Sequence, residues 1–170
     1  EMVLAAGAKA DRISFGNTIK KERDVARAFA LGVRLFAVDC RAEVEKIARA
    51  APGAKVFCRF LFDCAGAEWP LSRKFGCDTE MAVDVLEHAH RLGLDPCGVS
   101  FHVGSQQPRT QAWDGALKSA AAVFRACAER GINLTMVNLG GGFPTRYLKE
   151  VPAVKSYGRS IFRALRKHFG

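Results

Sequence analysis

Apolar and polar positions along the chain alternate between two patterns, and each pattern predicts a different kind of element. Short apolar runs, several of them β-branched or aromatic, predict strands. Apolar residues repeated every three or four positions, as at Val83, Leu86 and Ala89, predict helices. The predicted strands are residues 13–17, 34–39, 55–62, 97–103 and 135–139; the predicted helices are residues 20–31, 42–50, 79–92, 112–130 and 154–168. With a long loop over residues 63–77, this pattern indicates five βα units without an internal linker.

Strands that alternate with helices form parallel sheets, either in a doubly wound fold or in a (β/α)₈ barrel. Both folds place their chemistry at the C-terminal ends of the strands. Candidate functional residues lie at four predicted strand ends and within the third strand: Asn17, Asp39, His102, Gly140 and Arg59. A doubly wound nucleotide fold carries its glycine loop after the first strand, whereas here the loop follows the fifth. This order favours an α/β TIM barrel, whose strands we expect to be parallel and to be neighbours in chain order.

The glycine run at residues 140–142 is the most informative segment, because it follows an apolar strand directly and is closed by Phe143-Pro144. Consecutive glycines let backbone N–H groups converge on an anion such as phosphate. A tight turn between strand and helix is the alternative interpretation. The segment around His102 has a similar pattern, in which an apolar strand is followed by Gly104 and Ser105.

The composition of the 170 residues, 49% hydrophobic and 25% charged, indicates a globular protein. No apolar run approaches the roughly 18 residues that a membrane helix needs. The chain opens without a basic segment before its first apolar residues, so we expect no signal peptide.

The six cysteines, Cys40, Cys58, Cys64, Cys77, Cys97 and Cys127, show no CxxC spacing. Because Cys58 and Cys97 lie in predicted strands and Cys127 in a predicted helix, we expect buried, reduced thiols of a cytoplasmic protein. Nothing in their spacing supports a zinc site, and we expect no metal.

The formal net charge of +9, from 26 Lys and Arg against 17 Asp and Glu, raises the question of nucleic-acid binding. The basic residues are scattered over predicted helix faces, as at Arg159, Arg163, Arg166 and Lys167, without interleaved aromatic residues. Solvated helix faces explain this pattern better, and we expect neither a nucleic acid nor a membrane as partner.

Taken together, these residues resemble the fold type III pyridoxal-phosphate decarboxylases, the group of ornithine, diaminopimelate and arginine decarboxylases related to alanine racemase. The matching segments are 74–76, 101–105 and 138–144, with Asp39 and Arg59; Lys74 and His102 are 28 residues apart, and His102 and Gly140 are 38 apart. Within that group, the segment 68–74 is similar to bacterial ornithine or ornithine/lysine decarboxylases.

The resemblance implies pyridoxal 5'-phosphate as the cofactor and assigns an expected role to each matching residue. It implies that His102 stacks on the cofactor ring and that Arg59 lies near the polar edge of the cofactor. It also implies that Ser105 and the backbone of Gly140, Gly141 and Gly142 bind the phosphate of the cofactor. Lys74 and Asp39 are expected at the subunit interface of a homodimer.

The chain also lacks parts of the family pattern. It contains no Tyr-Ala-Val-Lys-Ala-Asn-like motif, which carries the cofactor-binding lysine, and no Glu-Pro-Gly-Arg motif, whose glutamate meets the pyridine nitrogen. We therefore expect residues 1–170 to be one segment of the cofactor-binding barrel domain, from about barrel strand 3 to strand 7. The N-terminal strands, strand 8 and the C-terminal β domain would be absent, and the segment alone would be inactive.

The resemblance implies that the intact enzyme decarboxylates a basic amino acid, ornithine or lysine, to a diamine in polyamine biosynthesis. A diaminopimelate decarboxylase is one alternative, and a non-catalytic relative that binds a partner, like the antizyme inhibitors, is another. The substrate stays open, because the residues that hold its distal amine would come largely from outside this segment.

Overall fold

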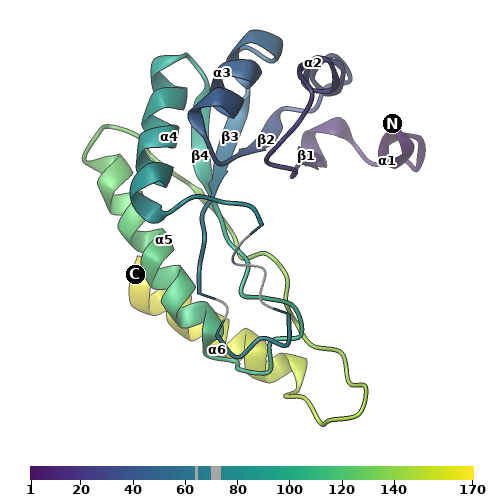
Figure 1. Ribbon diagram of the computed structural model, residues 1–170, viewed down its shortest axis with the longest axis vertical. Helices are drawn as coiled ribbons and strands as arrows, with labels where there is room; N and C mark the ends of the chain where they lie inside the picture. The colour runs from purple at the N-terminus through teal and green to yellow at the C-terminus, as the bar shows by residue number, and fades with distance from the viewer. Residues whose placement is uncertain (64, 70–73) are drawn as a thin grey trace.

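The five predicted strands form one parallel sheet in the computed structural model, which describes residues 1–63, 65–69 and 74–170. The strands are β1 (Ser14–Phe15), β2 (Leu35–Val38), β3 (Lys55–Arg59), β4 (Asp95–Ser100) and β5 (Met136–Asn138). Each strand pairs in parallel with the next one in the chain, in the order β1-β2-β3-β4-β5. The sheet is curled, as in part of a TIM barrel (Figure 1). The predicted strand direction and order are confirmed.

Helices connect the strands and pack against one another in chain order. They are α2 (Glu22–Ala30), α3 (Arg41–Ala50), α4 (Thr79–Arg91), α5 (Ala112–Ala128) and α6 (Val154–Phe169). Alternate residues of β2 show why the helices cover one face of the sheet: Phe36 and Val38 belong to the large core shared with the helices. Ala37 lies in a separate small cluster with Phe57 and Cys97, on the opposite face. In a closed barrel that opposite face is the interior.

Several element boundaries differ from the prediction. The third strand ends at Arg59 rather than Phe62, and Phe60 forms only an isolated bridge with Cys77. Two short helices were not predicted, α1 (Met2–Ala5) and the 3₁₀ helix η1 (Ala10–Arg12). Neither buries any residue, so no apolar periodicity marks them in the sequence.

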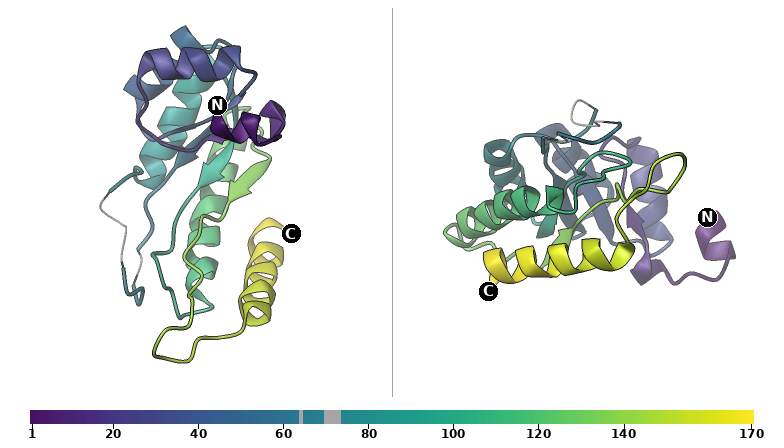
Figure 2. Two further views of the ribbon diagram at one scale, coloured as in Figure 1. Left: turned by 90° about the vertical axis from the view of Figure 1, so that its right-hand side faces the viewer. Right: turned by 90° about the horizontal axis from the view of Figure 1, so that it is seen from below.

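Loops leave β3, β4 and β5 at their C-terminal ends and extend along α5 toward the start of α6 (Figures 1 and 2). An aromatic cluster fixes the last of these loops to the helices. The rings of Trp113 on α5 and Phe143 are stacked with centroids 5.0 Å apart, and Tyr157 on α6 contacts both edge-on. The buried Tyr157 hydroxyl donates a hydrogen bond to the carbonyl of Gln107, at 2.9 Å. These contacts hold the segment after the glycine run in a fixed position on the scaffold.

A buried ionic cluster joins the C-terminal ends of β1 and β2. The Lys20 ammonium donates hydrogen bonds to the carbonyl oxygens of Asn17, at 2.7 Å, and Ala37, at 2.6 Å. It also lies 2.9 Å from the Glu43 carboxylate, which pairs with Lys46 as well. Burial lowers the pKa of Lys20, and the bond to Glu43 opposes that shift. Removing Glu43 would leave the buried Lys20 ammonium without a counter-ion, so the cluster fixes how the two strand ends are arranged.

Four of the six cysteines, Cys58, Cys77, Cys97 and Cys127, are buried free thiols, as predicted, and Cys40 is partly buried. Cys64 lies outside the described residues. Within the part of the chain that the structure describes, we find no helix that is both long enough and apolar enough to span a bilayer.

The packing of the core predicts that two leucines in and just after α4 contribute very differently to the free energy of unfolding. Leu86 is fully buried and Leu92 is 43% exposed. Replacing Leu86 with Ala in the full-length protein should lower the free energy of unfolding by about 2–5 kcal/mol, because the side chain leaves a cavity that its neighbours only partly fill. Leu92→Ala is the matched control and should change it by less than about 1 kcal/mol. Urea unfolding followed by circular dichroism measures both, and equal losses would contradict the packing.

Candidate functional site

The C-terminal ends of β3, β4 and β5 surround a small cavity of about 120 Å³. Three of the predicted site residues, Arg59, His102 and Gly140, lie in its wall, and each comes from a different strand end. The other residues of the wall are Ser14, Gly16, Phe57, Ser100, Phe101 and Asn138. Phe101 and Asn138 lie in the segments 101–105 and 138–144 that the sequence singled out, whereas Ser14, Gly16, Phe57 and Ser100 were not predicted, because their contribution depends on which way the strand and loop turn.

His102 is held as a neutral imidazole. Its Nδ1 accepts a hydrogen bond from the backbone N–H of Gly104, at 2.9 Å, so the ring proton sits on Nε2. Burial and the nearby positive charge of Arg59 lower the pKa of His102 below its ordinary value. The side chain therefore presents a flat, uncharged ring at the end of β4.

Gly140 and Gly142 allow two stretches of backbone to touch. Gly140 has φ +65° and Gly142 has φ +104°, conformations that residues with a Cβ rarely adopt. A Cβ at Gly140 would lie 2.2 Å from the carbonyl oxygen of Phe101, and a Cβ at Gly142 would lie 2.3 Å from that of Gly104. These two glycines are therefore required for the fold, because the loop after β5 runs directly against the segment that carries His102.

Gly141 differs from its neighbours, because its φ is ordinary and a Cβ there would contact only His102 Nε2, at 3.5 Å. Among the described residues, no hydrogen-bond acceptor is found for the N–H groups of Gly141 and Gly142. The Ser105 hydroxyl also has no hydrogen-bond partner among the described residues. The N–H of Gly140 instead donates to Asn138 Oδ1, at 2.9 Å. The loop thus keeps two backbone donors, with a hydroxyl on the neighbouring segment, for a ligand that accepts hydrogen bonds.

Two glutamines hold the glycine loop against the segment after His102. Gln107 is fully buried, its N–H donates to the carbonyl of Gly142 at 2.9 Å, and its side chain donates to Val103. Gln106 has φ +52°, and its side-chain amide binds the backbone of Thr145 through both its oxygen and its nitrogen, at 2.7 and 3.4 Å. The sequence offers little sign of these roles, since glutamines after a strand are most often solvated.

Lys74 and Asp39, the two residues expected at an interface, lie outside the cavity wall. Lys74 is exposed. The Asp39 carboxylate accepts a hydrogen bond from the N–H of Gly76, at 2.9 Å. This bond ties the end of β2 to a strap, residues 74–77, that runs parallel to the chain at the end of β3. Phe75, in the same strap, lies with its ring centroid 5.9 Å from the Arg59 guanidinium. Residues 70–73 belong to the segment 68–74 that the sequence analysis singled out, and they lie outside the described residues.

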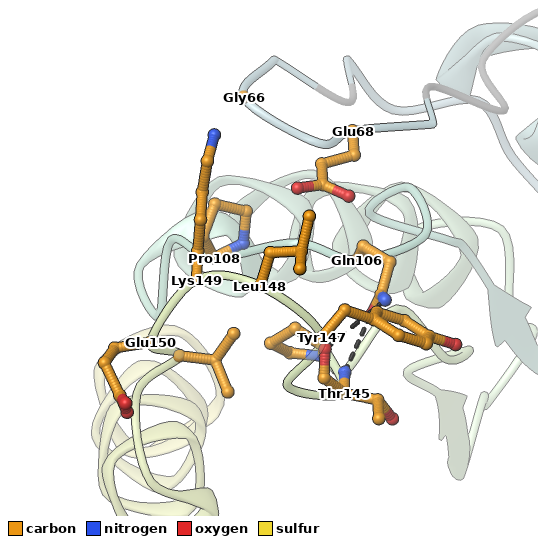
Figure 3. A pocket seen from close by; sticks show the side chains of 11 residues that line it. Gly66, Glu68, Gln106, Pro108, Thr145, Tyr147, Leu148, Lys149 and Glu150 are labelled. Carbon is orange, nitrogen blue, oxygen red and sulfur yellow. Dashed lines mark hydrogen bonds between the residues drawn. The ribbon is translucent and has the colours of Figure 1, made fainter.

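A second cavity of about 440 Å³ lies at the rim, between the loops that contain Glu68 and Leu148 (Figure 3). The side chains of these two residues point toward each other in that view, and Gln106 and Thr145 form part of its wall. None of the predicted site residues lines it. Over the residues that the structure describes, no group of three or more side chains is placed to hold a metal ion.

The comparison with known proteins gives one family for the whole chain. The sequence profile "Pyridoxal-dependent decarboxylase, pyridoxal binding domain" matches residues 1–170. A lysine/ornithine decarboxylase of Selenomonas ruminantium is 37% identical over 144 residues, which are 85% of this chain. An antizyme inhibitor 2 of Xenopus laevis is 33% identical over 144 residues, again 85% of this chain.

Solved structures agree with the sequence comparison. The crystal structure of an SrLDC mutant in complex with PLP matches 99% of this chain with a TM-score of 0.91 and 32% sequence identity. The chain covers 44% of that structure, 37% of the lysine/ornithine decarboxylase and 32% of the antizyme inhibitor. It therefore spans less than half the length of the proteins it matches.

The position of Arg59 predicts a measurable change in His102. Replacing Arg59 with Gln should raise the pKa of His102, because the substitution removes a positive charge that disfavours the imidazolium, while burial still keeps the pKa low. Arg125→Gln, at an exposed position of α5, is the matched control and should leave it unchanged. NMR titration of the His102 ring in the full-length protein gives both values. A pKa that does not move in Arg59→Gln would show that the guanidinium points elsewhere.

Proposed function

The chain belongs to the family of pyridoxal-dependent decarboxylases, whose pyridoxal-binding domain profile matches residues 1–170, and on this basis we propose that the full-length protein removes the α-carboxyl group of ornithine or lysine. One observation carries the proposal. Among the described residues, the N–H groups of Gly141 and Gly142 and the Ser105 hydroxyl have no acceptor, and Gly141 lies beside the neutral His102, at the edge where parallel strands end. That arrangement suits a flat aromatic ring bearing a phosphate.

Each residue of the candidate site has a role in this proposal. The N–H groups of Gly141 and Gly142 and the Ser105 hydroxyl would bind the cofactor's phosphate, and His102 would contact its ring. Arg59 would contribute positive charge near the ring's polar edge, and its charge adds to the effect of burial in lowering the pKa of His102, so the face that meets the ring carries no charge. When bound, pyridoxal phosphate supplies the electron sink for loss of the carboxylate.

The same proposal places the chain within the whole protein. Residues 1–170 correspond to about barrel strands 3 to 7, and the lysine and glutamate that the family uses come from other parts of the polypeptide. Lys74 and Asp39 lie at the interface of a homodimer, the exposed Lys74 by direct contact and Asp39 through the strap that it anchors. Buried free cysteines are consistent with a cytoplasmic protein.

The similarity to a lysine/ornithine decarboxylase supports ornithine and lysine as substrates and a diamine of polyamine biosynthesis as the product. Diaminopimelate is the alternative substrate within the same chemistry. A non-catalytic binding protein is the second candidate function, and it is favoured by the 33% identity to an antizyme inhibitor. The residues of this chain fit both candidates, because the groups that complete catalysis lie outside it.

A direct assay separates these candidates. The full-length protein, saturated with pyridoxal phosphate, should release carbon dioxide and putrescine from L-ornithine, or carbon dioxide and cadaverine from L-lysine. Chromatography of the amine products and trapping of the carbon dioxide measure both reactions. Release of carbon dioxide from diaminopimelate alone would show that diaminopimelate is the substrate. No release of carbon dioxide from any of the three amino acids would favour a non-catalytic binding protein.

The site itself is tested by Gly141→Val. The fold should tolerate this substitution, because a Cβ at Gly141 approaches nothing closer than 3.5 Å. The branched side chain would occupy the space beside His102 and beside the free N–H groups, so the Kd for pyridoxal phosphate should rise by about tenfold or more, the loss of one good charged hydrogen bond. Fluorescence titration of the apoprotein measures the Kd, and thermal unfolding without cofactor checks the fold.

Gly158→Val is the matched control, because Gly158 lies on α6 with no atom within 4 Å of its would-be Cβ. This variant should bind pyridoxal phosphate as the unmodified protein does. Equal affinity in Gly141→Val and Gly158→Val would mean that the glycine loop is only a turn.

A further inference from the structure

The outer surface between α5 and α6 contains a polar cavity of about 280 Å³, separate from the strand ends. Its wall consists of Thr110, Gln111, Ser156, Arg159, Ser160 and Arg163, which we call the α5–α6 groove. None of these residues lines the cavity that holds His102, Arg59 and Gly140. The groove is therefore a second, independent concave surface of the molecule.

The α6 side of the groove follows from the helical repeat. Residues 156, 159, 160 and 163 are separated by three, four and seven positions, so they share one face of the helix. That face lies next to the buried stripe of Tyr157, Ile161 and Ala164, which packs the helix onto the core. Ser156 and Ser160 are half-buried, while Arg159 and Arg163 are exposed. The hydroxyls thus lie deeper in the groove and the guanidinium groups lie at its rim.

The charge around the groove is unbalanced. Helix α6 contains five Lys and Arg residues and no Asp or Glu. Helix α5 contains one acidic residue, Asp114, and that carboxylate is already bound to Lys167, at 3.1 Å, and His168, at 3.0 Å. Among the described residues, neither Arg159 nor Arg163 lies within 4.0 Å of a carboxylate. No wall residue of the groove is acidic.

The basic residues near the N-terminus of α6 have no acidic residue of the same helix to offset their charge. Lys155 and Arg159 lie in the first two turns of α6. A positive charge in the first turn, as at Lys155, is disfavoured, because the peptide dipoles already give that end of a helix a partial positive charge; this effect falls off before Arg159. A bound anion would remove this repulsion, whereas solvent and salt only screen it.

We propose that the α5–α6 groove is a binding site for a phosphate-bearing small anion, distinct from the site for pyridoxal phosphate. Guanidinium groups match phosphate oxygens through paired hydrogen bonds, and three hydroxyls and a side-chain amide add donors around them. The volume lies just under the roughly 300–1,000 Å³ of typical small-molecule pockets. This size favours a compact di- or polyphosphate over a larger ligand.

The proposal is tested on the full-length protein saturated with pyridoxal phosphate, so that the glycine loop is already occupied. Isothermal titration calorimetry with inorganic pyrophosphate, at low ionic strength, should show one site per chain. Arg159→Ala and Arg163→Ala should each raise the Kd by about tenfold, since each removes a charge-assisted contact. Added sodium chloride should also weaken binding.

Arg125→Ala is the matched control, an exposed arginine of α5 that does not line the groove, and its Kd should be unchanged. Arg159→Lys with Arg163→Lys keeps the charge but loses the paired hydrogen bonds, so binding should weaken without loss of the fold. A parallel titration with ATP distinguishes a nucleotide from a bare polyphosphate as the source of the phosphates.

Three results would overturn the proposal. They are no heat of binding up to millimolar pyrophosphate, an unchanged Kd in both arginine variants, and binding of a poly-glutamate peptide without binding of pyrophosphate. The last would show a surface for an acidic protein segment. Decarboxylation in Arg159→Ala should equal that of the unmodified protein, so this test and the test of the proposed function fail independently.

Discussion

The site depends on one constraint, which is that the backbones leaving β4 and β5 run against each other with no side chain between them. Gly140 and Gly142 face the carbonyl oxygens of Phe101 and Gly104 at distances where no Cβ fits. Within the sheet, Gly98 lets β4 approach Met136 of β5 in the same way. Because these contacts involve backbone atoms, they fix the relative position of His102 and of the N–H groups of the loop. A ligand at this edge therefore meets a preformed set of donors beside a neutral ring.

Most of the fold could be predicted from the sequence, because it follows from local patterns. Short apolar runs gave the five strands, and apolar spacing such as Val83, Leu86 and Ala89 gave the helices that cover them. The late position of the glycine run indicated a barrel rather than a doubly wound sheet. His102 and Gly140 were predicted at strand ends and Arg59 within the third strand; because that strand ends at Arg59, the parallel strands bring all three residues together.

What the sequence left open depends on contacts between distant segments. The three glycines look alike in the sequence, yet two are required by backbone contacts and only Gly141 can accept a side chain. Lys20 looks like an ordinary first residue of a helix, but it is buried against two strand ends and Glu43. Arg159 and Arg163 look like solvated positions of a helix. Their common groove appears only when α5 and its single carboxylate are placed beside α6.

The central claim is that this chain holds the phosphate and ring of pyridoxal phosphate at the ends of β4 and β5. The most direct measurement is a crystal structure of the full-length protein with the cofactor bound. The account predicts phosphate oxygens within hydrogen-bond distance of the N–H groups of Gly141 and Gly142 and of the Ser105 hydroxyl, with the His102 ring flat against the pyridine. A cofactor phosphate bound by other residues, with the N–H groups of the glycine loop facing water, would contradict it.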